Sequence, residues 1–286
     1  MVSQPPLKRV LFEFRGRLAA TYTLFTIEML ATLLRPYYLG SAIDGLMRGS
    51  YVGLIQLSIA HLIYLTVGTV RHMYDTRTFT AIYTSFVTGL LSRNSGDAHV
   101  SRQSAHSTLS RQVVDFLEYD FNYLIEAVYN VFGSLILLTL YNSTVVGICL
   151  AVLVPVILLG HRYGRHAIRL NYEQHDELER QVDVISGRDS VAITEHYRRL
   201  REWQVRLSDR EAWNFGATEL LVLIAITASL MVSTETSRAT LQVGAVVGIY
   251  NYILKFASGL ETIPYMIQRF GALKDILRRM DSATTE

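Results

Sequence analysis

The chain has 286 residues, of which 50% are hydrophobic and 18% are charged, and its formal net charge at pH 7 is +2. The mean hydropathy of +0.23 is high for a protein that stays in water, and the apolar residues gather in long stretches, which argues against one or two soluble domains. The chain has one cysteine, Cys149, which excludes an intrachain disulfide and a cysteine-based metal cluster.

The first predicted element is the segment 1–17, MVSQPPLKRVLFEFRGR, which is basic and amphipathic. It has no short apolar core followed by a small-residue cleavage site, so it does not have the pattern of a cleaved signal peptide. We expect it to form an N-terminal amphipathic elbow ahead of the first membrane span.

Long apolar stretches follow this segment along most of the chain. A run of about 18 or more mostly apolar residues predicts a helix that crosses a bilayer. The sequence therefore predicts an all-α membrane protein with a transmembrane domain over 18–280 and a polar tail at 281–286. Its six spans are 18–41, 52–70, 119–141, 144–160, 214–233 and 241–263.

Basic residues are concentrated on one side of these spans. They precede the first and third spans, follow the second and sixth, and fill the segment between the fourth and fifth. Only Arg35, Arg48 and Arg238 lie near the opposite loops. The positive-inside rule then places both termini in the cytoplasm, and we expect a multi-pass protein of the inner membrane. Since cationic flanks of spans explain the basic segments, no nucleic-acid partner is expected.

The connections on the cytoplasmic side are long, whereas the outer ones are short. Residues 71–113 and 161–213 are polar and poor in glycine and proline. Their apolar residues recur at intervals of three and four between charges, which is typical of helices. We expect spans two to five to continue into the cytoplasm as helical hairpins, with a turn at Gly187 and Asp189. The alternative is a soluble bundle with no docking role beneath the membrane.

Ionisable side chains lie within the predicted spans, where they are costly and therefore of functional interest. At 1.5 Å per residue, Glu28, Glu126 and Lys255 fall roughly 10–15 Å from the inner edge, so they can form one polar cluster. Such a cluster either holds helices together by an ion pair or carries a proton or a charged substrate. His61, near the middle of the second span, is either a packed, hydrogen-bonded residue or a proton relay.

Tyrosines are abundant, at 17 in the chain. Most fit interfacial belts or helix packing, but those within the spans can also line a cavity and stack on an amphipathic ligand. His161 and His166 are five residues apart and so lie on different helix faces, and no metal site or cofactor is expected. The candidate residues for a translocation path or for energy coupling are Glu28, His61, Tyr64, Glu126, Tyr129, Tyr250 and Lys255.

Taken together, the spans, the short outer loops and the two long inner hairpins resemble the transmembrane domain of ABC exporters. RPYYLGSAIDGL (35–46) resembles the end of that family's first helix, and 111–138 resembles the entry to its third helix. ISGRDSVAITEHYRRL (185–200) occupies the position of the second coupling segment. IPYMIQRFGALKDILRRM (263–280) resembles the exit of the sixth helix. The resemblance covers essentially the whole chain.

This resemblance implies a type 1 exporter fold that assembles as a helix-swapped dimer, most simply a homodimer. It also implies that the turns of the two inner hairpins dock on a nucleotide-binding subunit. The candidate docking residues are Asp97, Arg102, Ser104, Arg188, Asp189 and Glu195.

The motifs of an ATPase are missing from these 286 residues. A Walker A loop requires GxxxxGK[ST], whose amides and lysine hold the phosphates. The lysines here, Lys8, Lys255 and Lys274, each follow a leucine, and no LSGGQ-like or Walker B pattern is present. We therefore expect that this stretch is not an enzyme by itself and that any ATPase activity comes from a partner.

Three functions remain open at this stage. The first is a transporter subunit that moves an amphipathic small molecule, lipid or peptide with the help of a separate nucleotide-binding subunit. The second is a proton-coupled transporter that keeps an ABC-like fold and needs no ATP. The third is a membrane scaffold or binding protein that transports nothing and recruits a partner through its hairpins.

Overall fold

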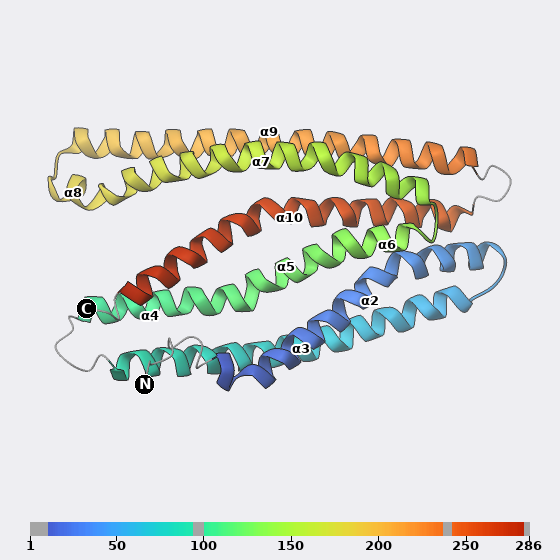
Figure 1. Ribbon diagram of the computed structural model, residues 1–286, viewed down its shortest axis with the longest axis horizontal. Helices are drawn as coiled ribbons and strands as arrows, with labels where there is room; N and C mark the ends of the chain where they lie inside the picture. Colours follow the sequence, from blue (N-terminus) through green and yellow to red (C-terminus); the bar gives the residue numbers. More distant parts are fainter. Residues whose placement is uncertain (1–10, 94–99, 237–241, 283–286) are drawn as a thin grey trace. The chain divides into compact units, whose positions relative to one another are not determined.

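The computed structural model describes residues 11–93, 100–236 and 242–282, and every regular element in these ranges is helical (Figure 1). The all-α prediction is therefore confirmed. In chain order the elements are α2 (Arg15–Met47), α3 (Val52–Arg93), α4 (Val100–Asp115), the π-helical segment η1 (Phe116–Asp120), α5 (Phe121–Val128), the π-helical segment η2 (Tyr129–Gly133), α6 (Ser134–Leu138), α7 (Ser143–Glu179), α8 (Gln181–Ser186), α9 (Ser190–Thr236) and α10 (Val243–Ser282).

Five stretches of the described chain are long and apolar enough to cross a membrane, which confirms a multi-pass membrane protein. They are Val52–Gly89, Ser107–Leu138, Ser143–Ser186, Ser190–Glu235 and Val243–Lys274. The predicted first span lies in α2, whose apolar face is interrupted by Glu28 and Arg35, and α2 is not among the five. A total of six spans stays a prediction.

The chain divides into two compact units. The larger unit takes Met1–Tyr141 and Ser237–Glu286, and it contains α2 to α6 together with α10. The hairpin unit takes Asn142–Thr236 and contains α7 to α9.

In the larger unit, α2 and α3 lie side by side as an antiparallel pair (Figure 1). The turn between them includes Gly49, whose φ of 74° lies in the left-handed region that glycine adopts without strain. α3 then runs without a break from Val52 to Arg93, well past residue 70, where its apolar stretch ends. The helix therefore extends about 35 Å beyond that stretch, at 1.5 Å per residue.

α10 packs closely on α2 near the outer ends of both helices. A Cβ atom added to Gly40 would lie 2.5 Å from the carbonyl oxygen of Gly244, so only glycine permits this approach. The Asp44 carboxylate accepts a hydrogen bond of 2.8 Å from the Gly244 amide at the start of α10. Further along, the hydroxyl of the buried Tyr252 donates to the carbonyl of Leu33 at 3.0 Å. These bonds fix the register of α10 on α2.

The third predicted span is not a uniform α-helix. Its backbone stays helical from α4 to α6 but widens into π-helical turns at η1 and η2. Such turns are rare and frequently occur at functional sites. They shift the faces of the helix, and the first one ends on the buried Asp120.

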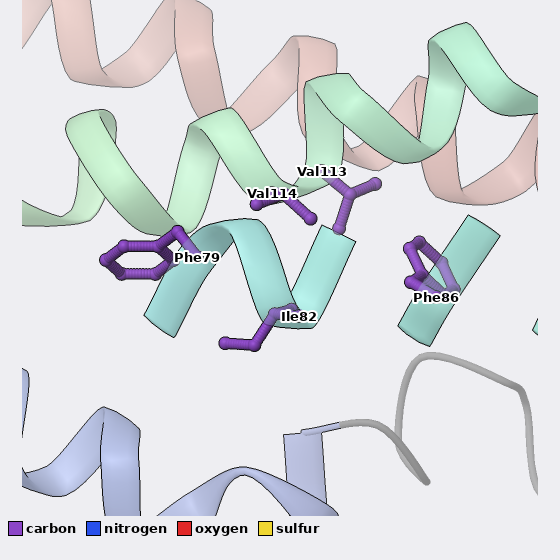
Figure 2. Close-up of a cluster of buried hydrophobic side chains, with 5 residues drawn as sticks. All are labelled: Phe79, Ile82, Phe86, Val113 and Val114. Atoms are coloured by element: carbon purple, nitrogen blue, oxygen red, sulfur yellow. The ribbon is translucent and has the colours of Figure 1, made fainter. Parts of the chain in front are cut away.

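The inner end of the larger unit is closed by a hydrophobic cluster of buried side chains on α3 and α4 (Figure 2). Its buried members are Phe79, Ile82, Phe86, Val113 and Val114. Partly buried residues pack against them, namely Phe14 just before α2, Leu18 of α2, and Leu273 and Ile276 of α10. The cluster explains why α3 and α4 are ordered as a pair beyond their apolar stretches.

In the hairpin unit, α7 and α9 lie side by side over most of their length (Figure 1). Asn142 caps α7 by accepting a hydrogen bond of 2.9 Å from the Thr144 amide. At the other end, Arg188 has a φ of 54° and Asp189 accepts a bond of 2.9 Å from the Val191 amide. The turn predicted around Gly187 and Asp189 therefore separates α8 from α9.

Candidate functional site

A buried ionic cluster joins α2 to α3 in the larger unit. The Arg71 guanidinium lies 2.5 Å from Glu28 and 2.6 Å from Asp75, which is four residues further along the same helix. The two acids are only 7% and 6% exposed. Gly68 leaves room for the carboxylate of Glu28, since an added Cβ would lie 3.2 Å from its Oε1.

The charges of this cluster do not balance. Two carboxylates face a single guanidinium, and Asp75 Oδ1 is buried with no hydrogen-bond partner in the described part of the chain. Arg71 also lies 4.9 Å from the ring centroid of Phe25, which holds it between the two helices. A buried carboxylate without a full partner tends to take up a proton. The cluster can therefore hold one proton or one additional positive charge.

A second buried acid connects the third span to α10. Asp120 is 1% exposed and lies at the end of η1. Its carboxylate accepts 2.8 Å and 2.7 Å hydrogen bonds from Tyr265 and Arg269. On the other side, the Tyr22 hydroxyl donates to the Leu117 carbonyl at 2.9 Å. The π-helical turn is thus tied to both α2 and α10.

A cavity of about 610 Å³ lies between α2, α3 and α10. This size falls within the range of about 300–1,000 Å³ that is usual for small-molecule sites. Its lining is largely apolar, with cationic and hydrogen-bonding side chains among the apolar ones. The lining residues are Thr32, Arg35, Pro36, Leu39, Leu57, Ser58, His61, Leu62, Asn251 and Lys255.

The charged residues of the cavity wall are all basic. Arg35 lies over the ring of Tyr64, 5.4 Å from its centroid, and the His61 ring lies 5.9 Å from the same ring. In the part of the chain that the structure describes, no carboxylate comes within 4.0 Å of Arg35 or Lys255. Glu126 is within electrostatic range of Lys255 but beyond ion-pair distance.

The structure separates the residues that were expected to form one cluster. Glu28 pairs with Arg71, while His61 and Lys255 line the cavity and Tyr64 lies beside it. Glu126 is half-buried on α5, and Tyr129 is half-buried at the start of η2. Tyr250 is exposed on α10 and is not part of the cavity wall.

Several important residues were not anticipated from the sequence. Arg35 lies inside the predicted span 18–41, so its position signals a charge at membrane depth, but it was grouped with the outer flanks. Arg71 was read as an inner flank, and Asp75 and Asn251 were not singled out. Asp120 is preceded by no motif that distinguishes it from neighbouring acids.

Two of the predicted docking residues, Arg188 and Asp189, lie at the turn of the second inner hairpin. Arg188 and Asp189 are exposed between α8 and α9, and the partly exposed Glu195 of α9 pairs with Arg198 at 2.7 Å and Arg199 at 3.1 Å. Arg102 and Ser104 belong to α4. Asp97 lies outside the described residues.

Comparisons with known proteins agree with this architecture. The family model described as "ABC transporter transmembrane region" matches residues 7–242. Among solved structures, a bacterial Atm1-family ABC exporter with ATP bound is similar, with a TM-score of 0.64 and 14% sequence identity. The alignment covers 93% of this chain and 54% of that chain, and at this identity it shows the fold alone. No curated protein matches the sequence.

Proposed function

Because this chain belongs to the ABC transporter transmembrane region family, we propose that it is the membrane-spanning subunit of a transporter. The observation that carries the proposal is the extent of the family match, which takes in 7–242. The cavity inside the larger unit supports it, because a transporter needs a site for its substrate within the membrane. The substrate class is an amphipathic small molecule, lipid or peptide.

The working assembly in this proposal is a dimer, most simply of two copies of the chain. The division of the chain supports an exchange of helices, since α7 to α9 form a contact unit separate from the remaining helices. A detergent-corrected mass of twice 32.4 kDa is expected. A strict monomer in both detergent and lipid would contradict the dimer.

A nucleotide-binding partner would supply the energy in the first version of this function. No Walker A sequence occurs within the 286 residues, so ATP hydrolysis would have to come from outside them. In this proposal the protein lies in the inner membrane with both termini in the cytoplasm. The exposed turn at Arg188 and Asp189 faces the nucleotide-binding partner.

A second version, driven by protons, is favoured by the ionic cluster of α2 and α3. Glu28, Asp75 and Arg71 carry one carboxylate in excess, and these groups lie in a helix pair of the larger unit. Tyr22 and Glu118 lie within electrostatic range of Asp75, so further titratable groups lie near the cluster. In this version, uptake and release of a proton there are coupled to movement of α2 against α3.

Flux measurements test the function and separate the two versions. Vesicles with and without the protein would receive radiolabelled amphipathic solutes with neutral, cationic and anionic head groups. Flux that requires ATP and the cell's own nucleotide-binding protein supports the first version. Flux that survives ATP depletion but collapses with a protonophore, and with Asp75→Asn or Glu126→Gln, supports the second. No flux under either energy source would contradict transport and favour a scaffold.

A further inference from the structure

We propose that the cavity between α2, α3 and α10 binds the anionic head group of an amphipathic molecule near the middle of the membrane. The proposal concerns binding, and it rests on the proposed function only where the bound molecule is taken to be the transported substrate. Four features of the cavity carry it: the sign of its charges, their depth, the lack of acids at ion-pair distance, and the apolar remainder of its wall.

The basic side chains of the cavity wall come from three different helices. Arg35 is on α2, His61 on α3 and Lys255 on α10, and all three line the same space of about 610 Å³. No aspartate or glutamate is among the lining residues. Asn251, one turn before Lys255, donates its amide N–H to the Val247 carbonyl at 2.8 Å, which orients the side chain at the cavity wall.

These basic groups lie at a common depth. Arg35 precedes the last residue of α2 by 12 residues. His61 follows the first residue of α3 by nine residues, and Lys255 follows the first residue of α10 by 12. At 1.5 Å per residue, these counts place all three about 14–18 Å from the outer ends of their helices. Half of a hydrocarbon core of about 30 Å corresponds to the same depth.

Cations at this depth require compensation. Isolated charges in the middle of a bilayer are costly and almost always pair with one another or face water. Arg35 gains a cation–π contact with Tyr64, and Lys255 gains attraction from Glu126 across more than ion-pair distance. One distant carboxylate cannot neutralise two cations. An anionic group held between Arg35 and Lys255 would complete the balance.

The rest of the wall fits an apolar body attached to that head group. Pro36, Leu39, Leu57 and Leu62 supply the apolar part of the lining. A site of this kind would disfavour a cationic amphipath, since its charge would be repelled by Arg35 and Lys255. It would also bind a neutral one less well, because the two cations would then stay unpaired. The ligand class is therefore an amphipathic organic anion with a phosphate, sulfate or carboxylate group.

Binding of three probes that share one chain length tests the proposal directly. Decyl phosphate, decanol and decyltrimethylammonium would be titrated against the protein in nanodiscs, with empty nanodiscs subtracted. We expect decyl phosphate to bind most tightly. Loss of one charged partner should weaken it about tenfold or more, so Lys255→Gln and Arg35→Gln should each show this loss.

Two variants keep the test independent of folding. Lys274→Gln removes an exposed lysine from the same helix and should bind decyl phosphate like the wild type. Lys255→Arg retains the charge and should keep most of the affinity. Equal affinity for the three probes in the wild type would overturn the proposal. It would also be overturned if Lys255→Gln, folded by circular dichroism, bound decyl phosphate unchanged.

The source of the anion is distinguished by two further arms. A phosphatidylglycerol that stays bound in native mass spectra of the wild type, and is lost from Lys255→Gln, identifies a lipid head group. Displacement of decyl phosphate by millimolar inorganic phosphate identifies a site for the free anion as well. Either result supports an anion site. Binding is measured without any flux. A protein that transports nothing can therefore still confirm the anion site, and a protein that binds no decyl phosphate can still prove to be a transporter.

Discussion

The larger unit buries several of its charged side chains, whereas the hairpin unit keeps nearly all of its described charged side chains on the surface. In the larger unit, Glu28, Asp75 and Asp120 are buried and held by arginine or tyrosine partners from other positions. In the described hairpin unit, His196 is the only buried polar side chain that can carry a charge, and it pairs with Glu177 at 2.9 Å.

The remaining ion pairs of the hairpin unit lie on the surface. Glu195 bonds to Arg198 and Arg199, and Arg169 bonds to Glu173, all of them exposed side chains. Surface pairs contribute little stability and are readily replaced, whereas breaking a buried pair leaves an uncompensated charge. The comparison indicates that the charges specifying internal structure and any internal site lie in the larger unit.

The largest effect is expected where a buried cation is removed. Arg71→Met would leave Glu28 and Asp75 buried beside each other without a partner, at a cost of about 3–5 kcal/mol. Thermal unfolding in detergent should show a strongly lowered midpoint or a failure to accumulate. Arg77→Met, at an exposed position of the same helix, serves as the control and should behave like the wild type. Equal unfolding midpoints for Arg71→Met and Arg77→Met would show that the ionic cluster does not stabilise the protein.

The hydrophobic cluster at the inner end of the larger unit should respond next. Ile82→Ala removes a side chain that is 1% exposed and should cost about 2–4 kcal/mol through lost burial and the cavity left behind. Ile63→Ala, at an exposed position of the same helix, is the matched control. Limited proteolysis should cut α3 and α4 faster in the first variant, and equal rates would contradict a core at this place.

The buried pair of the hairpin unit should have a smaller effect. Glu177→Ala would leave His196 buried without its partner, at a cost of about 1–3 kcal/mol. Glu173→Ala removes an acid that pairs only with an exposed arginine and should change stability by less than about 1 kcal/mol. Hydrogen exchange along α9 is the measurement, and a larger change from Glu173→Ala would reverse the interpretation.

The smallest effect is expected at Glu195. Its bonds to Arg198 and Arg199 are exposed on both sides, so Glu195→Gln should leave the unfolding midpoint unchanged within error at any salt concentration. If the variant instead abolishes binding of a nucleotide-binding partner while stability holds, the docking prediction for this turn is supported. A clear loss of stability would show that the hairpin surface is not simply solvated.

The sequence was sufficient for the helices and their inward continuation, but not for the way in which the inner ends pack. The apolar stretches that begin at 52 and 144 closely match the starts of α3 and α7, because apolar runs and the cap at Asn142 are local signals. The same stretches end near 70 and 160, and both helices continue beyond them, as the spacing of apolar residues in 71–113 and 161–213 predicts. The partner on which each continuation packs, as at the Phe79 and Val113 cluster, is not encoded by any local pattern.

The candidate site shows the same division between local and tertiary information. Glu28 could be identified as a buried charge from its place in an apolar stretch. Its partner Arg71 lies 43 residues away, and the pairing arises only from the register of α2 on α3. The similar depth of Glu28 and Lys255 in the membrane was likewise not enough to predict whether they meet. Depth does not tell which face of its helix a residue occupies.

The most direct test of the account is transport by membrane vesicles from cells that naturally make the chain, energised with both ATP and a proton gradient. Uptake of radiolabelled decyl phosphate would be compared between the wild type, the cavity variant Arg35→Gln with Lys255→Gln, and the surface variant Arg77→Gln with Lys274→Gln. The account predicts that the surface variant transports like the wild type and that the cavity variant loses transport while still reaching the membrane. Equal transport by the two variants, or none by the wild type, would contradict it.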